Sequence, residues 1–207
     1  MQLEFTGPAG RIEALLEEPE GAVRAAVVFA HPHPMFGGTM HTKAVYQGAK
    51  GLTRIGCAVL RFNFRGVGSS EGTFDQGEGE MSDFRAALDL MAARHPGVAL
   101  WAAGFSFGSW IAMETGAQDS RVSVLIGVAP PITREGYAWN HTLASDKPKF
   151  FVQGEMDEIC PLKDMRTFYA QLKEPKELVV IDAASHLFDG KTNEVGEALE
   201  DLLGDFE

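Results

Sequence analysis

Short apolar runs rich in β-branched residues alternate along this chain with amphipathic stretches that have helical spacing. Eight segments have the composition of strands, namely residues 3–6, 11–16, 25–30, 58–64, 98–103, 122–128, 149–152 and 177–181. The first two flank Gly7-Pro8-Ala9-Gly10, a sequence typical of a hairpin turn. Helical stretches separate the later ones, which predicts a mostly parallel eight-stranded sheet with helices on both faces.

Three amphipathic helices are clear from the spacing of apolar residues. Residues 44–55 place apolar side chains on one face and stop before Gly56, and residues 81–91 repeat such a stripe before Pro96-Gly97. The third covers residues 195–206, with Thr192 or Asn193 as its N-cap. No repeat or linker interrupts the pattern, so we expect a single α/β domain over residues 1–207.

The charge balance and the short apolar runs exclude several classes of binding partner. Lys and Arg number 18 against 29 Asp and Glu, a net charge of −11, which argues against nucleic acid and anionic lipid. The apolar runs are shorter than the ~20 residues that a bilayer requires, and no signal peptide is visible at the N-terminus. Two cysteines, Cys57 and Cys160, make no disulfide framework. We expect a cytoplasmic protein, of an oligomeric state that the sequence does not reveal.

A serine between two glycines is the first chemical signal. Gly104-Phe105-Ser106-Phe107-Gly108 follows a predicted strand and enters an apolar helix. In such a turn the glycines let strand and helix approach closely, and the serine hydroxyl stands free at the edge of the sheet. A second match, around Ser70, leads into a polar glycine-rich loop. The context favours Ser106 as a nucleophile; the alternative is a small residue in a tight turn.

A serine nucleophile needs a base to take its proton and an acid to orient that base. On this kind of sheet the acid and then the histidine follow the serine along the chain. Only His141 and His186 lie after Ser106, and His186 directly follows the last predicted strand. This position favours His186 as the base over a role as a surface-loop histidine.

The acid is expected just after the preceding strand. Asp157 follows residues 149–152 by a few positions, which brings its carboxylate to the same edge of the sheet. Asp182 lies only four residues before His186 and is expected to end its own strand. Asp157 is therefore favoured, with the neighbouring Glu155 and Glu158 as alternatives.

A histidine- and proline-rich loop follows the strand at residues 25–30. This loop is where a second donor for an oxyanion is expected, and proline has no N–H. The candidate donors are His31, His33, Met35 and Phe36. Two other interpretations stay open: a zinc site formed by His31 and His33 with a third ligand such as His41, or histidines that cap the sheet edge.

Together these features resemble the α/β-hydrolase superfamily, and within it the small serine hydrolases related to dienelactone hydrolase. Their signature His-Pro-His-Pro-x-x-Gly-Gly-Thr-Met stands at residues 31–40, and a second signature stands at residues 60–72. The similarity runs from residue 3 to residue 206. It implies an α/β-hydrolase fold whose second strand is antiparallel, without a metal or an organic cofactor.

The resemblance also implies roles for individual residues. The implied catalytic residues are Ser106, Asp157 and His186. The implied oxyanion donors are the N–H groups of Phe107 and His33, with Met35 as the alternative because a proline at position 32 replaces the usual glycine. Dienelactone hydrolases themselves have a cysteine nucleophile, so the serine departs from that activity.

Three further residues are candidates for the substrate pocket: Met35, Arg65 and Trp139. For Trp139 a place in the core is the alternative. Arg65 is expected at the carboxyl edge of the sheet, where bracing of loops is favoured and binding of an acidic group of the substrate is the alternative. Acidic residues close to it in sequence could neutralise it, namely Glu71, Asp75 and Glu78. Cys57 and Cys160 are expected to be packing residues.

We therefore expect a serine carboxylesterase that cleaves small esters through an acyl-enzyme on Ser106. Thioesterase, small-amide hydrolase and acyltransferase activities would use the same residues, and a non-catalytic ligand-binding protein is an alternative of another class. In this superfamily a lid usually follows the sixth strand. Residues 129–148 are too few for a multi-helix cap, so we expect a short flap and short-chain substrates.

Overall fold

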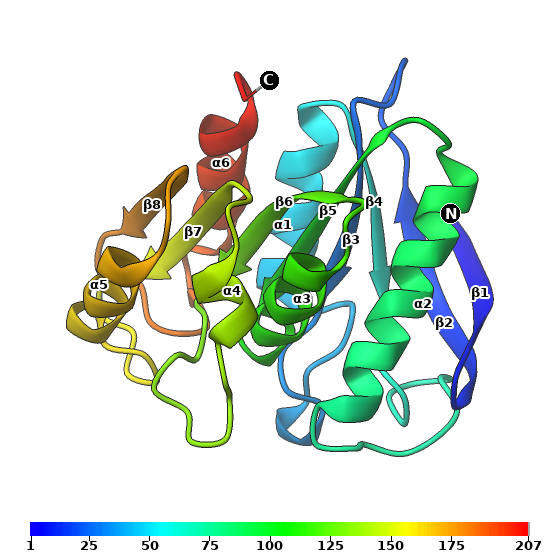
Figure 1. The fold of residues 1–207 in the computed structure, drawn as a ribbon, viewed down its shortest axis with the longest axis horizontal. Coiled ribbons are helices and arrows are strands. Elements are labelled where there is room, and N and C mark those ends of the chain that lie inside the picture. The colour runs from blue at the N-terminus through cyan, green and yellow to red at the C-terminus, as the bar shows by residue number, and fades with distance from the viewer. Residues whose placement is uncertain (207) are drawn as a thin grey trace.

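An eight-stranded sheet forms the centre of the computed structural model, which describes residues 1–206 (Figure 1). The strands are β1 (Gln2–Gly7), β2 (Gly10–Glu17), β3 (Ala25–Ala30), β4 (Cys57–Phe62), β5 (Ala99–Phe105), β6 (Val122–Val128), β7 (Lys149–Gly154) and β8 (Lys176–Ile181). Their order in the sheet is β1-β2-β4-β3-β5-β6-β7-β8. Only β2 runs antiparallel to its neighbours, and β4, β3, β5, β6, β7 and β8 are parallel.

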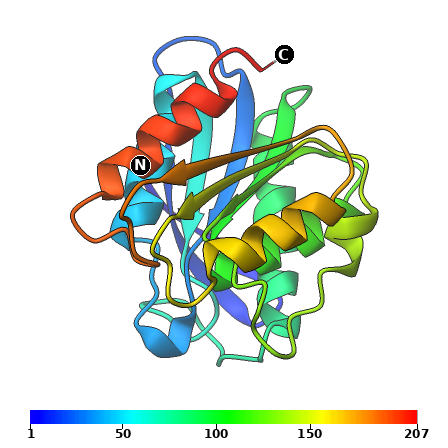
Figure 2. The same ribbon diagram turned by 90° about the vertical axis from the view of Figure 1, so that its left-hand side faces the viewer.

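Helices cover both faces of the sheet, as predicted. They are α1 (Lys43–Arg54), α2 (Glu78–Arg94), α3 (Phe107–Gln118), α4 (Asn140–Ala144), α5 (Leu162–Gln171) and α6 (Thr192–Leu203), with a short 3-10 helix, η1 (Pro34–Phe36). Figure 2 shows α1 and α6 on one face, and α2, α3 and α5 on the other. Each face has its own buried apolar cluster. The single-domain α/β architecture expected from the sequence is confirmed.

The central strands of the sheet are largely apolar because helices cover both faces of the sheet. Every residue of β3, β4 and β7 is buried. β3 is therefore a continuous apolar segment without alternation, whereas β4 and β7 also bury Arg61, Lys149 and Gln153. Predicted boundaries differ from the observed ones mostly by one or two residues, the usual uncertainty of element ends. The predicted caps of the last helix are wrong: α6 begins at Thr192 and its N-cap is Lys191.

The parallel strands bring their carboxyl ends to one edge of the sheet. In Figure 1 the loops that follow β3, β6 and β7 gather along this lower edge. In an open parallel sheet, side chains from loops far apart in sequence meet at this edge. Among residues 1–206 the longest apolar helical segments fall short of what a bilayer crossing requires.

Candidate functional site

Ser106 lies in the sharp turn between β5 and α3. Its backbone has φ 52° and ψ −122°, a region that costs a non-glycine residue about 1–3 kcal/mol. The turn closes because Gly104 and Gly108 have no side chains: a Cβ on Gly104 would meet the Gly108 carbonyl, and a Cβ on Gly108 would meet the end of β3. The strain holds the serine hydroxyl outside the helix and at the edge of the sheet.

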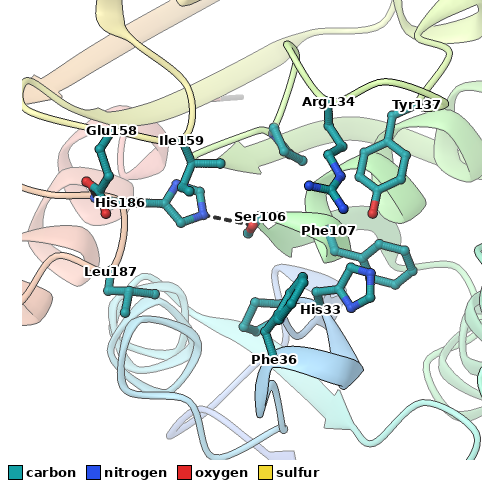
Figure 3. Close-up of a pocket in the computed structure, with 12 residues that line it drawn as sticks. His33, Phe36, Ser106, Phe107, Arg134, Tyr137, Glu158, Ile159, His186 and Leu187 are labelled. Carbon is teal, nitrogen blue, oxygen red and sulfur yellow. Dashed lines mark hydrogen bonds between the residues drawn. The ribbon is translucent and has the colours of Figure 1, made fainter.

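His186 connects Ser106 to Asp157. Its Nε2 lies 2.9 Å from the Ser106 Oγ, a contact drawn as a dashed line in Figure 3. Its Nδ1 lies 2.9 Å from Oδ2 of Asp157. All three side chains are buried. The structure therefore brings together, in hydrogen-bonding order, the three residues that the sequence proposes as nucleophile, base and acid.

Backbone and side-chain donors hold the Asp157 carboxylate in place. Its Oδ1 accepts hydrogen bonds of 2.8 Å from the N–H groups of Ile159 and Cys160. Its Oδ2, the oxygen that faces His186, also accepts a 2.9 Å hydrogen bond from Nε2 of Gln153 at the end of β7. The loop thus fixes both oxygens before the imidazole makes its contact.

The two glutamates that were alternatives to Asp157 have other partners. Glu155 accepts a 2.8 Å hydrogen bond from the N–H of Ala183. Glu158 accepts a 3.2 Å hydrogen bond from the backbone N–H of His186 and lines the cavity beside it. Neither carboxylate contacts the His186 ring within residues 1–206, so the geometry selects Asp157.

The N–H groups of Phe107 and His33 have no hydrogen-bond acceptor within residues 1–206, and both residues line the same cavity as Ser106. Phe107 is the first residue of α3, where an N–H has no acceptor within the helix. The Met35 N–H donates to Nδ1 of His33 at 3.2 Å, which removes it from the alternatives. The His33 N–H has no acceptor within residues 1–206. Of the two candidates for the second donor, the geometry favours His33.

The ring nitrogens of His31 are both engaged by the backbone. Nδ1 lies 2.6 Å from the Pro32 carbonyl oxygen, and Nε2 accepts a 3.1 Å hydrogen bond from the Phe64 N–H. This network assigns the proton to Nδ1. His33 instead packs its ring among three phenylalanines, with centroid distances of 4.8–5.0 Å. In the part of the chain described, no three His, Cys, Asp or Glu side chains are grouped so as to bind a metal ion.

We expect His31 to make the protein less stable in mild acid. Burial lowers the pKa of His31 to about 4, whereas the unfolded chain takes up the proton near pH 6.5. The unfolded state therefore binds more protons between these values, and the free energy of unfolding falls as the pH is lowered through this window, by roughly 2 kcal/mol at pH 5. Urea unfolding at pH 7.5 and at pH 5 measures the loss.

A His31→Gln variant is the control for this prediction. It should be less stable than wild type at pH 7.5, because the Phe64 N–H and the Pro32 carbonyl lose well-placed partners. Its stability should fall less than that of wild type between pH 7.5 and pH 5. Parallel pH profiles for the two proteins would show that His31 does not cause the acid sensitivity.

A cavity of about 270 Å³ opens beside the Ser106 hydroxyl (Figure 3). Its walls are mostly apolar and come from five segments, which follow β3, β5, β6, β7 and β8. The lining residues are Pro32, His33, Phe36, Ser106, Phe107, Pro131, Arg134, Tyr137, Glu158, Ile159, His186 and Leu187. Three of the apolar side chains at its mouth, Phe36, Ile159 and Leu187, are exposed. A small apolar pocket with a few polar groups is typical of a small-molecule site.

The three pocket residues expected from the sequence do not line this cavity. Met35 is exposed on η1, and Trp139 is buried in the core, where it packs on Phe168 at 5.4 Å. Arg65 pairs with the fully buried Asp83 on α2 through two hydrogen bonds of 2.8 and 2.9 Å. Asp83 also raises the pKa of Arg65. The pocket role expected for Met35 and Trp139 is wrong. Arg65 does not line the pocket either and instead braces its loop against α2, the role that the sequence favours for it.

The sequence interpretation missed one wall of the cavity. Pro131, Arg134 and Tyr137 reach it from residues 129–148, the short flap that contains α4. The flap has no helical or strand periodicity, so nothing in its pattern shows which side chains point inward.

Two buried thiols, Cys57 and Cys160, have pKa values raised to about 12 by burial, as suits packing residues.

Comparison with known proteins shows a clear relationship. The family model described as serine aminopeptidase, S33, matches residues 21–145, more than half of the chain. An uncharacterized protein of Rickettsia prowazekii is 35% identical over 209 residues, covering 98% of this chain and 88% of that protein.

Solved structures agree with this relationship. An α/β serine hydrolase homologue from Coxiella burnetii has 39% identity and a TM-score of 0.91, covering 98% of this chain and 97% of that one. A serine hydrolase without a lid from Xanthomonas campestris has 33% identity and a TM-score of 0.88, covering 97% and 92%. The chain belongs to the serine aminopeptidase S33 family of α/β serine hydrolases.

Proposed function

We propose that this hydrolase cleaves small carboxylic esters through an acyl-enzyme on Ser106. The observation that carries the proposal is the continuous path from the strained Ser106 through His186 to Asp157, with hydrogen-bond distances of 2.9 Å at both steps. The path ends at a cavity large enough for a small ester. Such an arrangement is the one that acyl transfer by a serine requires.

The chemistry proceeds in two steps. The Ser106 Oγ attacks the ester carbonyl carbon while its proton passes to Nε2 of His186. The tetrahedral intermediate then expels the alcohol, which takes that proton as the C–O bond breaks. Water next attacks the acyl-enzyme by the same route, with His186 as base and then acid, and releases the carboxylic acid and the free serine.

One carboxylate and two backbone N–H groups assist both steps. Asp157 holds His186 with its Nδ1 protonated and stabilises the imidazolium that forms. The N–H groups of Phe107 and His33 donate to the oxyanion of the intermediate, a contribution of roughly 3–4 kcal/mol for each donor by analogy with other serine hydrolases. The buried setting of the three side chains strengthens these interactions relative to water.

The flap sets the size of the proposed substrate. It contains only the five-residue helix α4 and forms one wall of the cavity without covering it. A long acyl chain would leave its distal carbons in water, and each CH₂ that stays wet forgoes about 0.8 kcal/mol of binding. The small cavity therefore favours short acyl groups.

We expect the highest kcat/KM for esters whose acyl group has roughly two to six carbons, since longer chains gain little further burial. Activity should not rise at lipid–water interfaces. The measurement is kcat/KM against acyl length from acetate to palmitate, with and without micelles. A maximum at about twelve carbons or more, or a jump in rate at the micelle threshold, would contradict the proposal of an uncovered pocket.

A second experiment asks which leaving group and which acyl acceptor the enzyme uses. A thioester, a small amide, a lactone or an acyl acceptor other than water would meet the same three residues, and a closer relation to dienelactone hydrolases would favour lactones. A panel of p-nitrophenyl esters, acyl-CoAs and lactones, assayed on wild type and Ser106→Ala, ranks these classes. Turnover of none of them, with no reaction of Ser106, would favour a non-catalytic ligand-binding role.

A further inference from the structure

Arg134 faces the cavity and has no ion-pair partner in the described part of the chain. Arg134 is the only lysine or arginine among the lining residues, and no carboxylate within residues 1–206 forms an ion pair with it. The other arginine considered for substrate binding, Arg65, is held by Asp83. An unpaired guanidinium beside a largely apolar cavity is available to an anionic ligand.

The flap presents Arg134 from an anchored backbone. The Arg134 N–H donates to the Pro131 carbonyl at 3.0 Å, and the Tyr137 N–H donates to the Arg134 carbonyl at 3.2 Å. The Thr133 hydroxyl ties the same turn to the Ile159 carbonyl at 3.0 Å, on the loop that carries Asp157. The backbone on both sides of Arg134 is thus fixed relative to the catalytic loop.

Tyr137 adds a second donor to the same wall. Its ring stacks on Trp110 at 4.2 Å and 4°, and the Trp110 indole N–H donates to the Ala138 carbonyl at 2.8 Å. The Tyr137 hydroxyl has no hydrogen-bond partner in the described part of the chain, and burial raises its pKa, so it keeps its proton. Figure 3 shows this hydroxyl beside the Arg134 guanidinium, both directed into the cavity.

Glu158 places a negative charge on the His186 side of the cavity, and it also lines a neighbouring hollow together with Arg134 and Glu135. Glu158 lies next to His186, while Arg134 and Tyr137 lie across Ser106 from it (Figure 3). Because His186 protonates the departing alcohol, the alcohol half of an ester belongs on the His186 side. A carboxylate there would face Glu158, whereas a carboxylate on the acyl half would face Arg134.

We propose that Arg134 and Tyr137 form an anion subsite that selects esters with a carboxylate on the acyl half, such as monoesters of short dicarboxylic acids. The subsite rests on the proposed function and specifies its substrate class. It gives an otherwise strongly acidic protein, of net charge −11, one local point of attraction for an anionic substrate.

The test compares two pairs of esters that differ only in charge. Monoethyl glutarate and ethyl 4-carbamoylbutanoate place a carboxylate or a neutral amide on the acyl half. 3-Acetoxypropanoate and 3-acetoxypropanamide place the same two groups on the alcohol half. Acid release is followed with wild type, Arg134→Gln, Tyr137→Phe and Arg85→Gln. Arg85 is an exposed residue of α2 outside the cavity, so its variant changes net charge equally.

We expect Arg134→Gln to lower kcat/KM for monoethyl glutarate about 10- to 100-fold, chiefly through KM, because a charged hydrogen bond is lost. In the same variant, kcat/KM for ethyl 4-carbamoylbutanoate should change less than about twofold, because this neutral ester makes no charged hydrogen bond to Arg134. Tyr137→Phe keeps the stacking ring and should cost about threefold on the anionic ester alone. Arg85→Gln should match wild type with all four esters.

Two results would overturn the subsite: an unchanged preference for monoethyl glutarate over its amide in Arg134→Gln, or an effect limited to the alcohol-half pair. The failure of the proposed function has a different signature, since wild type would then hydrolyse neither member of either pair. Calorimetry on Ser106→Ala decides the subsite in that case. Binding of monoethyl glutarate should exceed that of its amide about tenfold, and adding Arg134→Gln should remove the difference; equal binding would overturn it.

Discussion

Replacing Ser106 with alanine should lower kcat for a good ester substrate by roughly 10⁴- to 10⁶-fold, as the loss of a serine nucleophile does in other hydrolases. The loss corresponds to about 5–8 kcal/mol of transition-state stabilisation. It is large because no other hydroxyl within residues 1–206 bonds to the His186 ring, and the remaining N–H donors cannot replace the covalent step. The alanine side chain should also relax the strained turn only slightly, so the fold should persist.

Ser70 supplies the matched control, because it occupies the other Gly-x-Ser-x-Gly match. Its hydroxyl donates to the Asn63 carbonyl at 2.8 Å and accepts from the Glu13 N–H at 3.1 Å. Ser70→Ala should therefore cost about 1–3 kcal/mol of stability while leaving kcat within about threefold. Steady-state kinetics on both variants decide the matter. Equal losses of kcat in the two variants, or a greater loss in Ser70→Ala, would show that Ser106 is not the nucleophile.

Asp157→Asn should lower kcat near neutral pH by about 10³- to 10⁴-fold, by analogy with the corresponding change in other Ser-His-Asp hydrolases. An amide in place of the carboxylate would turn an N–H toward His186 Nδ1. The imidazole would then place its own proton on Nε2, where it cannot accept the proton of Ser106. The substitution keeps the size of the side chain, so its effect measures the role of the carboxylate.

Glu155→Gln is the matched control for Asp157→Asn. Glu155 lies two residues away and bonds the Ala183 N–H, and an amide oxygen can keep that contact. Its kcat should stay within about threefold of wild type. Stopped-flow and steady-state rates for both variants test the assignment. If Asp157→Asn retains more than about a tenth of wild-type kcat, another group orients His186.

Much of the fold could be predicted because burial on two faces leaves a simple mark on the sequence. The runs at Ala25–Ala30 and Val122–Val128 coincide with β3 and β6, since strands covered by helices on both sides are largely apolar. Ser106, Asp157 and His186 could be proposed for a similar reason. Each lies within a few residues after the end of a recognisable strand, and parallel strands end at one edge.

The pocket could not be predicted, because its side chains lie on segments without periodicity. Arg134 and Tyr137 point inward only because the flap folds into a compact turn tied to Ile159 and stacked on Trp110. Arg65 shows the converse. Its acidic neighbours in sequence suggested local neutralisation, yet its main partner is Asp83, which α2 brings back to it from 18 residues further along. Such pairings follow from packing that the linear pattern does not record.

Covalent labelling with a fluorophosphonate tests the central claim most directly, because only an activated serine attacks phosphorus at neutral pH. Peptide mapping of the labelled protein should find one adduct per chain, on Ser106, in wild type and in Ser70→Ala. Ser106→Ala should take up no label, and Asp157→Asn should react far more slowly. A folded wild-type protein that takes up no label, or that carries the adduct on Ser70, would contradict the account.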